Sequence, residues 1–168
     1  MIVIMAGLPG SGKTTLARAL AANTAGRVVS KDEIRSALFA PTEIEYSTKQ
    51  DDFCLQLMLE LSAYLLRSDP KQMIFLDGRT FSRRYQIENV LRAADSLHQP
   101  WRILECVCEE NVARARLQED VRHPASNRDF DLYLRMKAQF EAIAEQKTVI
   151  DTGQALEHCI QSGLAALR

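Results

Sequence analysis

Long hydrophobic runs are missing from this sequence. Its most apolar segment, Phe53–Leu66, is interrupted by polar residues and is too short to cross a bilayer. No leader precedes the first apolar run either, because that run begins directly after Met1. The sequence therefore predicts a cytoplasmic protein that makes no contact with a membrane.

Cysteine is scarce, and charge of neither sign is in excess. The four cysteines include no C-x-x-C pair, which argues against a zinc site, and this usage fits a reduced compartment. The 21 lysines and arginines nearly match the 22 aspartates and glutamates, so the formal net charge is −1. Such a chain has no overall attraction to nucleic acid, which leaves only a local basic groove as a means of binding it.

Linkers, repeats and low-complexity segments are also missing, so we expect one domain over residues 1–168, long enough to bury a core. Short apolar runs alternate with longer helix-like segments, which is typical of an α/β fold built on a parallel sheet. The expected strands are Ile2–Ala6, Arg27–Ser30, Gln72–Leu76, Ile103–Cys108 and Lys147–Ile150. The expected helices are Lys13–Asn23, Asp32–Phe39, Thr48–Arg67, Arg83–Leu97, Glu110–Glu119, Phe130–Gln146 and Gln154–Leu167.

A glycine-rich loop directly follows the first predicted strand. Residues 7–14 read G-L-P-G-S-G-K-T, which matches the Walker A pattern G-x-x-x-x-G-K-[ST] between a strand and a helix. Glycine lets the backbone approach a phosphate closely, and successive N–H groups at a helix start bind anions. The residues expected to bind ATP here are Gly7, Leu8, Pro9, Gly10, Ser11, Gly12, Lys13, Thr14 and Thr15.

Two side chains of this loop have roles of their own in the prediction. Lys13 places a positive charge at the β- and γ-phosphates, and the Thr14 hydroxyl can ligate Mg²⁺. The alternative is a chance glycine-rich turn, which does not explain why a strand and a helix flank the motif in the required order.

A second signal for a phosphate site ends the third predicted strand. Asp77 follows four apolar residues, as in the Walker B pattern, where the carboxylate holds Mg²⁺ directly or through a water. Gly78 permits close approach of a ligand, and Arg79 follows it in the same predicted loop. The alternative for Asp77 is a simple turn-forming aspartate.

Asp32 and Arg35 stand three residues apart at a predicted helix start and therefore share one face. Asp32 can accept a proton from an attacking hydroxyl, and Arg35 can hold a polar or anionic acceptor. Because parallel sheets bind ligands at the carboxyl ends of their strands, this pair should meet the Walker loop in one crevice. The alternative is local, since Ser30 and Glu33 form a capping-box pattern and the helix dipole favours an aspartate in the first turn.

A long polar segment, Glu119–Asp129, interrupts the alternation of strands and helices. Loops of this length in a compact domain are often functional, so we predict a short lid there. Its arginines, Arg122 and Arg128, are placed to stabilise charge on a transferring phosphate. The alternative is a set of solvated surface charges balanced by neighbouring acids.

Four segments together carry a resemblance to a known family. They are GLPGSGKTTLARAL (7–20), SKDEIRSALF (30–39), IFLDGRTFSRR (74–84) and the late MKAQFEAI with VIDT after it. In this order they resemble the P-loop kinases grouped with polynucleotide kinase and zeta-toxin-like kinases, the AAA_33-type group. The resemblance implies a three-layer P-loop NTPase fold, with a five-stranded parallel sheet of order 2-3-1-4-5, helices on both faces and a short lid.

The resemblance also implies an activity and roles for single residues. The activity is ATP-dependent transfer of the γ-phosphate to a hydroxyl of a small-molecule or nucleic-acid acceptor, with Mg²⁺ as cofactor. Asp32 is then the general base, Arg122 the catalytic lid residue, and Arg114 a border of the adenine. The residues expected to face the acceptor are Asp32, Arg35, Asp77, Arg79 and Arg128.

A second class of function also uses a P-loop: a regulatory NTPase that switches a partner without a phosphoryl acceptor. The sequence favours the kinase, because the Asp32–Arg35 pair indicates an acceptor and no sensor region accompanies the core. The identity of the acceptor, and whether the protein is a monomer or a homodimer, stay open at this point.

Overall fold

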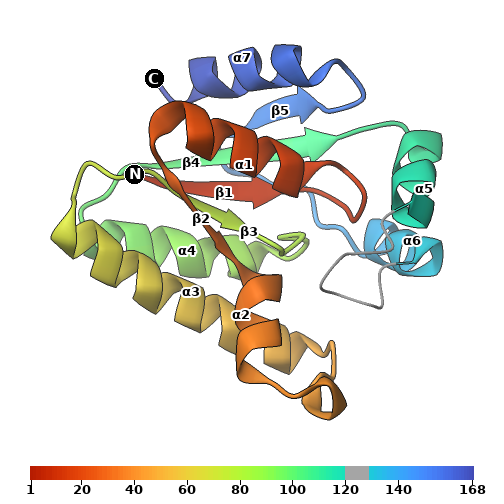
Figure 1. Cartoon of the computed structure of the whole chain (residues 1–168), viewed down its shortest axis with the longest axis horizontal. Coiled ribbons are helices and arrows are strands. Elements are labelled where there is room, and N and C mark those ends of the chain that lie inside the picture. Colours follow the sequence, from red (N-terminus) through yellow and green to blue (C-terminus); the bar gives the residue numbers. More distant parts are fainter. Residues whose placement is uncertain (120–128) are drawn as a thin grey trace.

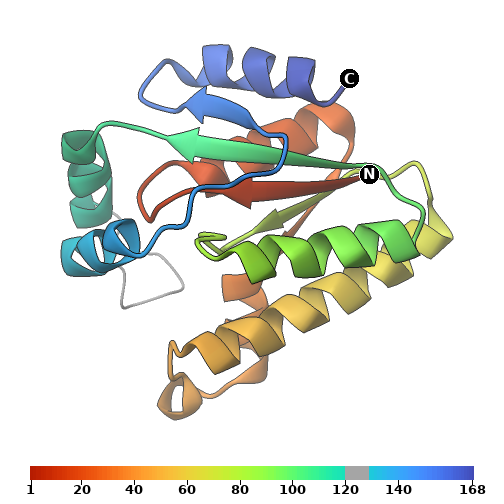
Figure 2. The same cartoon turned by 180° about the vertical axis from the view of Figure 1, so that it is seen from behind.

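The predicted parallel sheet is present in the computed structural model, which describes residues 1–119 and 129–168. Five strands lie in the order β2-β3-β1-β4-β5, and every neighbouring pair is parallel. Figures 1 and 2 show helices covering both faces of this sheet. Both the three-layer architecture and the strand order are therefore confirmed. The strands are β1 (Ile2–Ala6), β2 (Arg27–Ser30), β3 (Ile74–Asp77), β4 (Trp101–Val107) and β5 (Thr148–Asp151).

The described helices follow the predicted alternation closely. They are α1 (Lys13–Thr24), α2 (Lys31–Leu38), the 3₁₀ turn η1 (Pro41–Glu43), α3 (Thr48–Ser68), α4 (Arg84–Ser96), α5 (Glu110–Glu119), α6 (Phe130–Ala138) and α7 (Leu156–Ala166). Side-chain caps fix several of their starts, since Ser30 and Ser47 each accept a hydrogen bond from a backbone N–H of the first turn. Because every neighbouring pair of strands is parallel, all the carboxyl ends lie at one edge of the sheet.

The central strand divides the core into two halves. Every residue of β1 is fully buried, and the side chains alternate between the two faces of the sheet. Ile2 and Ile4 pack with apolar side chains of α3 and α4, whereas Val3 and Met5 pack with those of α1 and α7. Burial on both faces explains why this strand reads as a continuous apolar run in the sequence.

The helix predicted at Phe130–Gln146 is wrong in its second half, because α6 ends at Ala138. Beyond it the chain runs back toward the sheet without helical structure (Figure 2). The N–H of Glu141 donates to the carbonyl of Ser82, 2.9 Å away, so it does not continue the helical ladder. Ile143 is buried against the α3 and α4 side of the core. Tertiary contacts therefore override the local helical pattern of this segment.

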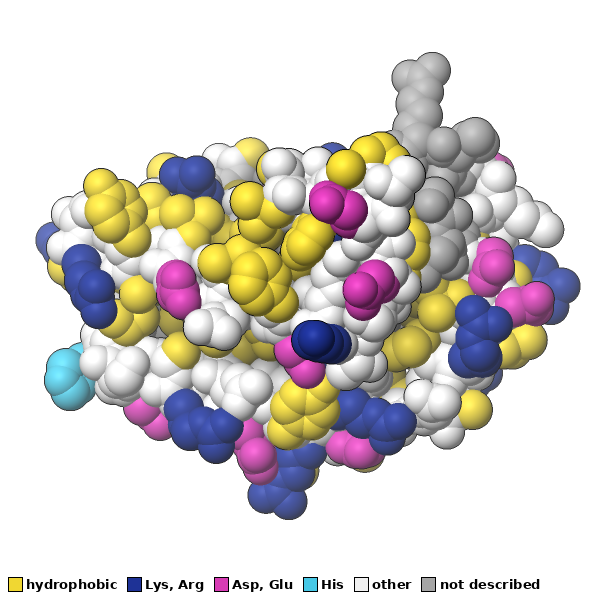
Figure 3. Space-filling model, turned by 90° about the horizontal axis from the view of Figure 1, so that it is seen from below, with side chains coloured by type: hydrophobic (Ala, Val, Ile, Leu, Met, Phe, Trp, Pro, Cys, Tyr) yellow, Lys and Arg dark blue, Asp and Glu magenta, His cyan; other side chains and the backbone are white. Residues whose placement is uncertain are grey.

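The long helix α3 covers one face of the sheet and also reaches the molecular surface. Met58 and Leu66 are buried in the core, whereas Phe53 and Tyr64 are about half exposed or more. The face seen in Figure 3 mixes such hydrophobic side chains with charged ones. In the part of the chain that the structure describes, no helix is long and apolar enough to span a membrane.

Candidate active site

The glycine-rich loop joins β1 to α1 in a backbone conformation that only glycine adopts without strain. Gly7, Gly10 and Gly12 all have positive φ, of 133°, 74° and 76°. A Cβ atom on Gly7 would lie 2.3 Å from the carbonyl oxygen of Cys106 in β4. The loop therefore packs closely against the neighbouring strand β4. Its backbone N–H groups lie at the start of α1, the position that an anion site requires.

Lys13 and Thr14 begin helix α1 and connect two cavities. Lys13 is mostly buried, and its Nζ donates to the carbonyl of Leu8 at 2.8 Å. Both side chains line a cavity of about 530 Å³ on the side of α5 and β5, and both also line a cavity of about 520 Å³ on the side of α2 and α3. The first cavity also includes Gly10 and Gly12 of the P-loop, so it is the candidate nucleotide side of the site.

An arginine of α5 lines the nucleotide side. Arg116 Nη2 donates to the carbonyl of Thr152 at 2.7 Å, and the Thr152 hydroxyl donates to the carbonyl of Ser11 at 2.8 Å. The guanidinium of Arg114, which the resemblance places at the adenine, lies 3.8 Å from the ring centroid of Phe130. Residues two apart on a helix point to different sides, so Arg114 and Arg116 have different neighbours.

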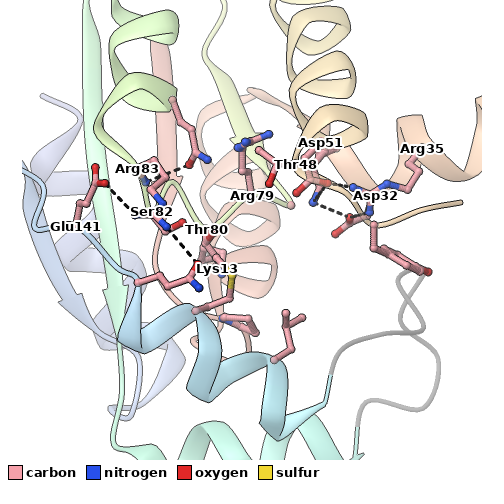
Figure 4. A pocket seen from close by; sticks show the side chains of 18 of the residues that line it. Lys13, Asp32, Arg35, Thr48, Asp51, Arg79, Thr80, Ser82, Arg83 and Glu141 are labelled. Atoms are coloured by element: carbon pink, nitrogen blue, oxygen red, sulfur yellow. Dashed lines mark hydrogen bonds and ion pairs between the residues drawn. The ribbon is translucent and has the colours of Figure 1, made fainter.

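The second cavity is the candidate acceptor side. Figure 4 shows Asp32, Arg35 and Asp51 gathered on one side of it and Arg83 and Glu141 on the other. Hydroxyl groups fill much of the remaining wall. They belong to Tyr46, Thr48, Thr80, Ser82 and Tyr85.

Asp32 and Arg35 lie where the sequence predicts, on one face of α2 and in the wall of this cavity. Arg35 Nη1 contacts Asp32 Oδ1 at 3.2 Å, and both side chains are largely buried. The local alternative is also partly present, because Ser30 accepts from the N–H of Glu33 at 3.4 Å. The carboxylate of Glu33 pairs with Arg18 on the surface, so the cap uses Ser30 and leaves Asp32 to the cavity.

Two charged residues that sequence reasoning missed complete this wall. Lys31 Nζ lies 3.4 Å from Asp32 Oδ1 and 3.0 Å from Asp51 Oδ1, and Arg35 Nη2 also contacts Asp51. Burial lowers the pKa of Lys31 to about 8, although the nearby Asp32 carboxylate opposes that shift. The acids Asp51 and Asp52 at the start of α3 were the available signal, but their side-chain partners lie 16 to 33 residues away.

Arg79 also lines this cavity, although its side chain is almost fully buried. Its Nη2 lies 2.5 Å from Asp52 Oδ1, and the Tyr85 hydroxyl donates to Asp52 Oδ2 at 3.1 Å. Nε and Nη1 of Arg79 have no hydrogen-bond partner among the described residues. Arg79 therefore links the loop after β3 to α3, and two of its nitrogen donors make no hydrogen bond to the described residues.

Asp77 ends β3 level with Ser30 of β2, at the carboxyl edge of the sheet. Its side chain is buried, and its Oδ1 has no hydrogen-bond partner among the described residues. A buried carboxylate oxygen without a donor fits a position completed by a cation or a water. Asp77 and the Thr14 hydroxyl together thus fit the donor set that Mg²⁺ prefers.

Arg122, predicted to be catalytic, and Arg128, predicted to contact the acceptor, lie with the rest of segment 120–128 of the predicted lid outside the described residues. The flanking positions are described: Glu119 ends α5, and Asp129 caps α6 by accepting from the N–H of Leu132 at 2.7 Å. Lys137 of α6 pairs with Glu110 of α5 at 2.8 Å. The two helices that border the segment are therefore held to each other.

A family model matches most of the chain and agrees with this arrangement. The model, AAA_33, is described as an AAA domain and matches residues 2–143. The chain belongs to this family. The match includes the P-loop, the Asp32–Arg35 pair and Asp77, so the predicted membership is confirmed. No curated protein sequence matches the chain.

Several solved structures share the fold of this AAA domain at low sequence identity. A sugar kinase from Janibacter sp. HTCC2649 has a TM-score of 0.72 and 21% identity, over 99% of this chain and 93% of its own. A gluconokinase from Sinorhizobium meliloti 1021 has a TM-score of 0.72 and 17% identity, over 99% and 90%. The Mycobacterium tuberculosis APS kinase CysC, in complex with AMPPNP and APS, has a TM-score of 0.75 and 12% identity, over 99% and 96%. Likeness at this level establishes the fold.

Proposed function

We propose that this AAA domain is a kinase that transfers the γ-phosphate of ATP to a hydroxyl of a small polar molecule. One observation carries the proposal: Lys13 and Thr14 line two cavities at once, one formed with the P-loop and the other with Asp32 and Arg35. A nucleotide in the first cavity would direct its terminal phosphate toward an acceptor in the second. A switch that only hydrolyses ATP has no need of the second cavity.

The proposed reaction forms one bond and breaks one. The acceptor oxygen bonds to the γ-phosphorus, the bond from that phosphorus to the β–γ bridging oxygen breaks, and ADP leaves. Asp32 accepts the proton of the acceptor hydroxyl, while Lys13 stabilises the negative charge on the transferring group. Arg35 holds the acceptor. Arg122, Arg128 and Arg114 keep the roles that the resemblance implies, as proposals.

Mg²⁺ is the proposed cofactor, and this chain offers the Thr14 hydroxyl and the Asp77 carboxylate to hold it. Bound there, the ion would supply positive charge for the phosphates. The protein itself holds the ligand groups in place. Burial of Asp77 at 1% exposure keeps its carboxylate fixed at the end of β3, the strand that pairs with β1.

The acceptor cavity suits a small molecule with several polar groups. Its volume of about 520 Å³ lies within the range of small-molecule sites. Its wall combines hydroxyls with paired charges, which can both donate to and accept from a polyhydroxyl compound. The names of the sugar kinase and gluconokinase structures support the same class. We place the reaction in the cytoplasm, in a single domain over residues 1–168.

The proposal is tested by following ATP consumption over panels of sugars, sugar acids, nucleosides and oligonucleotides, with product mass checked for one added phosphoryl group. Lys13→Ala should abolish transfer. Asp32→Asn should lower kcat by roughly 10²- to 10⁴-fold because the proton acceptor is lost, while ATP affinity stays near normal because the P-loop is unchanged.

Glu33→Gln is the matched control, since Glu33 is an acid in the same helical turn that pairs with Arg18 on the surface. It should leave the transfer rate unchanged. ATP hydrolysis that no acceptor accelerates, and that Asp32→Asn does not slow, would favour the switch over the kinase.

A further inference from the structure

We propose that Asp51 is a positioning residue for the base: it restrains Lys31 and Arg35 so that Asp32 keeps one carboxylate oxygen open to the acceptor hydroxyl. This inference rests on the proposed function. It assigns a task to the start of α3, where the sequence analysis named no single site residue.

Four charged side chains form a closed ring in the wall of the acceptor cavity. Lys31 and Arg35 both contact Asp32, at 3.4 and 3.2 Å, and both contact Asp51. The two cations therefore each bridge the same two carboxylates. Figure 4 shows the ring members Asp32, Arg35 and Asp51 pointing toward one another at the right of the cavity.

The ring uses one oxygen of each carboxylate. Both contacts to Asp32 end on Oδ1, and both contacts to Asp51 also end on Oδ1. Oδ2 of Asp32 is consequently the oxygen left for a proton from the acceptor. A carboxylate pinned through one oxygen by two donors has little rotational freedom, which suits a base that must meet a hydroxyl at hydrogen-bond distance.

Burial makes each member depend on the others. The side chains of Lys31 and Arg35 are 9% and 3% exposed, and that of Asp32 is 11% exposed. Charges this deeply buried are stable only when they are paired and hydrogen-bonded. With two carboxylates and two cations the ring is neutral, so removing Asp51 leaves two buried cations competing for Asp32 alone.

The neighbouring charges do not replace Asp51. Arg79, from the loop after β3, adds a further positive charge near Lys31, but Asp52 binds it. Lys13 lines the same cavity from α1, and it is also positive. The ring face of Tyr46 lies 5.1 Å from the guanidinium of Arg35 and supplies no full charge. Asp51 is therefore the carboxylate that balances Lys31 and Arg35 beside the base.

Asp51→Asn tests the inference, and Asp52→Asn is the matched control from the next position of the same helix. Asp51→Asn should lower kcat about 10- to 100-fold with ATP affinity unchanged, because the base is displaced rather than removed. Asp52→Asn loosens Arg79 instead and should raise the KM for the acceptor more than it lowers kcat. Asp51→Glu, which restores the carboxylate, should recover kcat to within about tenfold of the wild type.

A second readout does not depend on activity. Rotation of the Arg35 guanidinium, followed by ¹⁵N NMR of its side-chain resonances, should be slow in the wild type and in Asp52→Asn and fast in Asp51→Asn. Fast rotation in the wild type, or a kcat of Asp51→Asn within threefold of the wild type, would overturn the inference. Slow rotation in a wild type that phosphorylates no acceptor would instead overturn the proposed function.

Discussion

A buried lysine stands beside the candidate base, and its ionisation links stability to pH. Burial lowers the pKa of Lys31 to about 8, against 10.5 for the same group in the unfolded chain. Between these two values the unfolded state binds a proton that the folded state has lost. The free energy of unfolding should therefore increase as the pH rises from 8 to 10.5.

Lys31→Met should remove this contribution. Relative to that variant, the wild type should gain on the order of 2–3 kcal/mol in the free energy of unfolding between pH 8 and pH 10.5. Urea denaturation at a series of pH values measures the difference. Lys137→Met is the control: contact with Glu110 raises the pKa of Lys137, so this variant should show no such gain.

At the scale of elements, the turn from β1 to α1 has the least tolerance for change. A Cβ on Gly7 would meet the Cys106 carbonyl at 2.3 Å, and its φ of 133° is unfavourable for any other residue. Gly7→Ala should therefore lower the free energy of unfolding by about 1–3 kcal/mol and abolish ATP binding. Thermal unfolding and calorimetry measure the two effects.

Gly153 offers a contrasting position in the turn after β5. Its φ is not positive, and the nearest atom to an added Cβ is the flexible carboxylate end of Asp151 at 3.0 Å. Gly153→Ala should change stability by no more than about 0.5 kcal/mol. Equal losses in both variants would mean that the P-loop conformation does not depend on Gly7.

Sequence patterns predicted the limits of an element well where neighbouring residues determine those limits. The limits of β1, β2 and α5 agree with the prediction. The apolar run marks β1, and Ser30, which caps α2, marks the end of β2. The end of α6 was missed, since it depends on Glu141, whose carboxylate binds the side chain of Arg83 and the backbone N–H of Arg84 nearly 60 residues away.

The same distinction between local and long-range contacts applies to the residues of the site. The P-loop and the Asp32–Arg35 pair each lie within one short stretch of sequence, so spacing alone predicts each of them. The ion pairs Lys31–Asp51 and Arg79–Asp52 each join two different elements, so sequence spacing does not predict them. The contact of Arg116 with Thr152, and that of Arg114 with Phe130, depend on how α5 is rotated against its neighbours, which sequence spacing does not reveal.

For the whole molecule, nucleotide binding should appear as a gain in stability. Saturation with Mg²⁺–ATP at 100 times its Kd adds about 2.7 kcal/mol to the free energy of unfolding. In a domain of this size that corresponds to a rise in Tm of roughly 5–10 °C. Differential scanning fluorimetry measures it, and Lys13→Ala should lose most of the rise. A wild-type Tm that ATP does not move would contradict the assignment of the first cavity.

The order of the strands in the sheet also governs how the chain can fold while it is being synthesised. β1 leaves the ribosome first, yet its Ile2 pairs with Ile74 of β3 and with Trp101 of β4, which are translated much later. β2, the next strand to emerge, bonds to β3 and not to β1. Every residue of β1, the strand that leads into the phosphate loop, is apolar. Because β1 waits longest for its partner strands, aggregation of nascent chains should begin there.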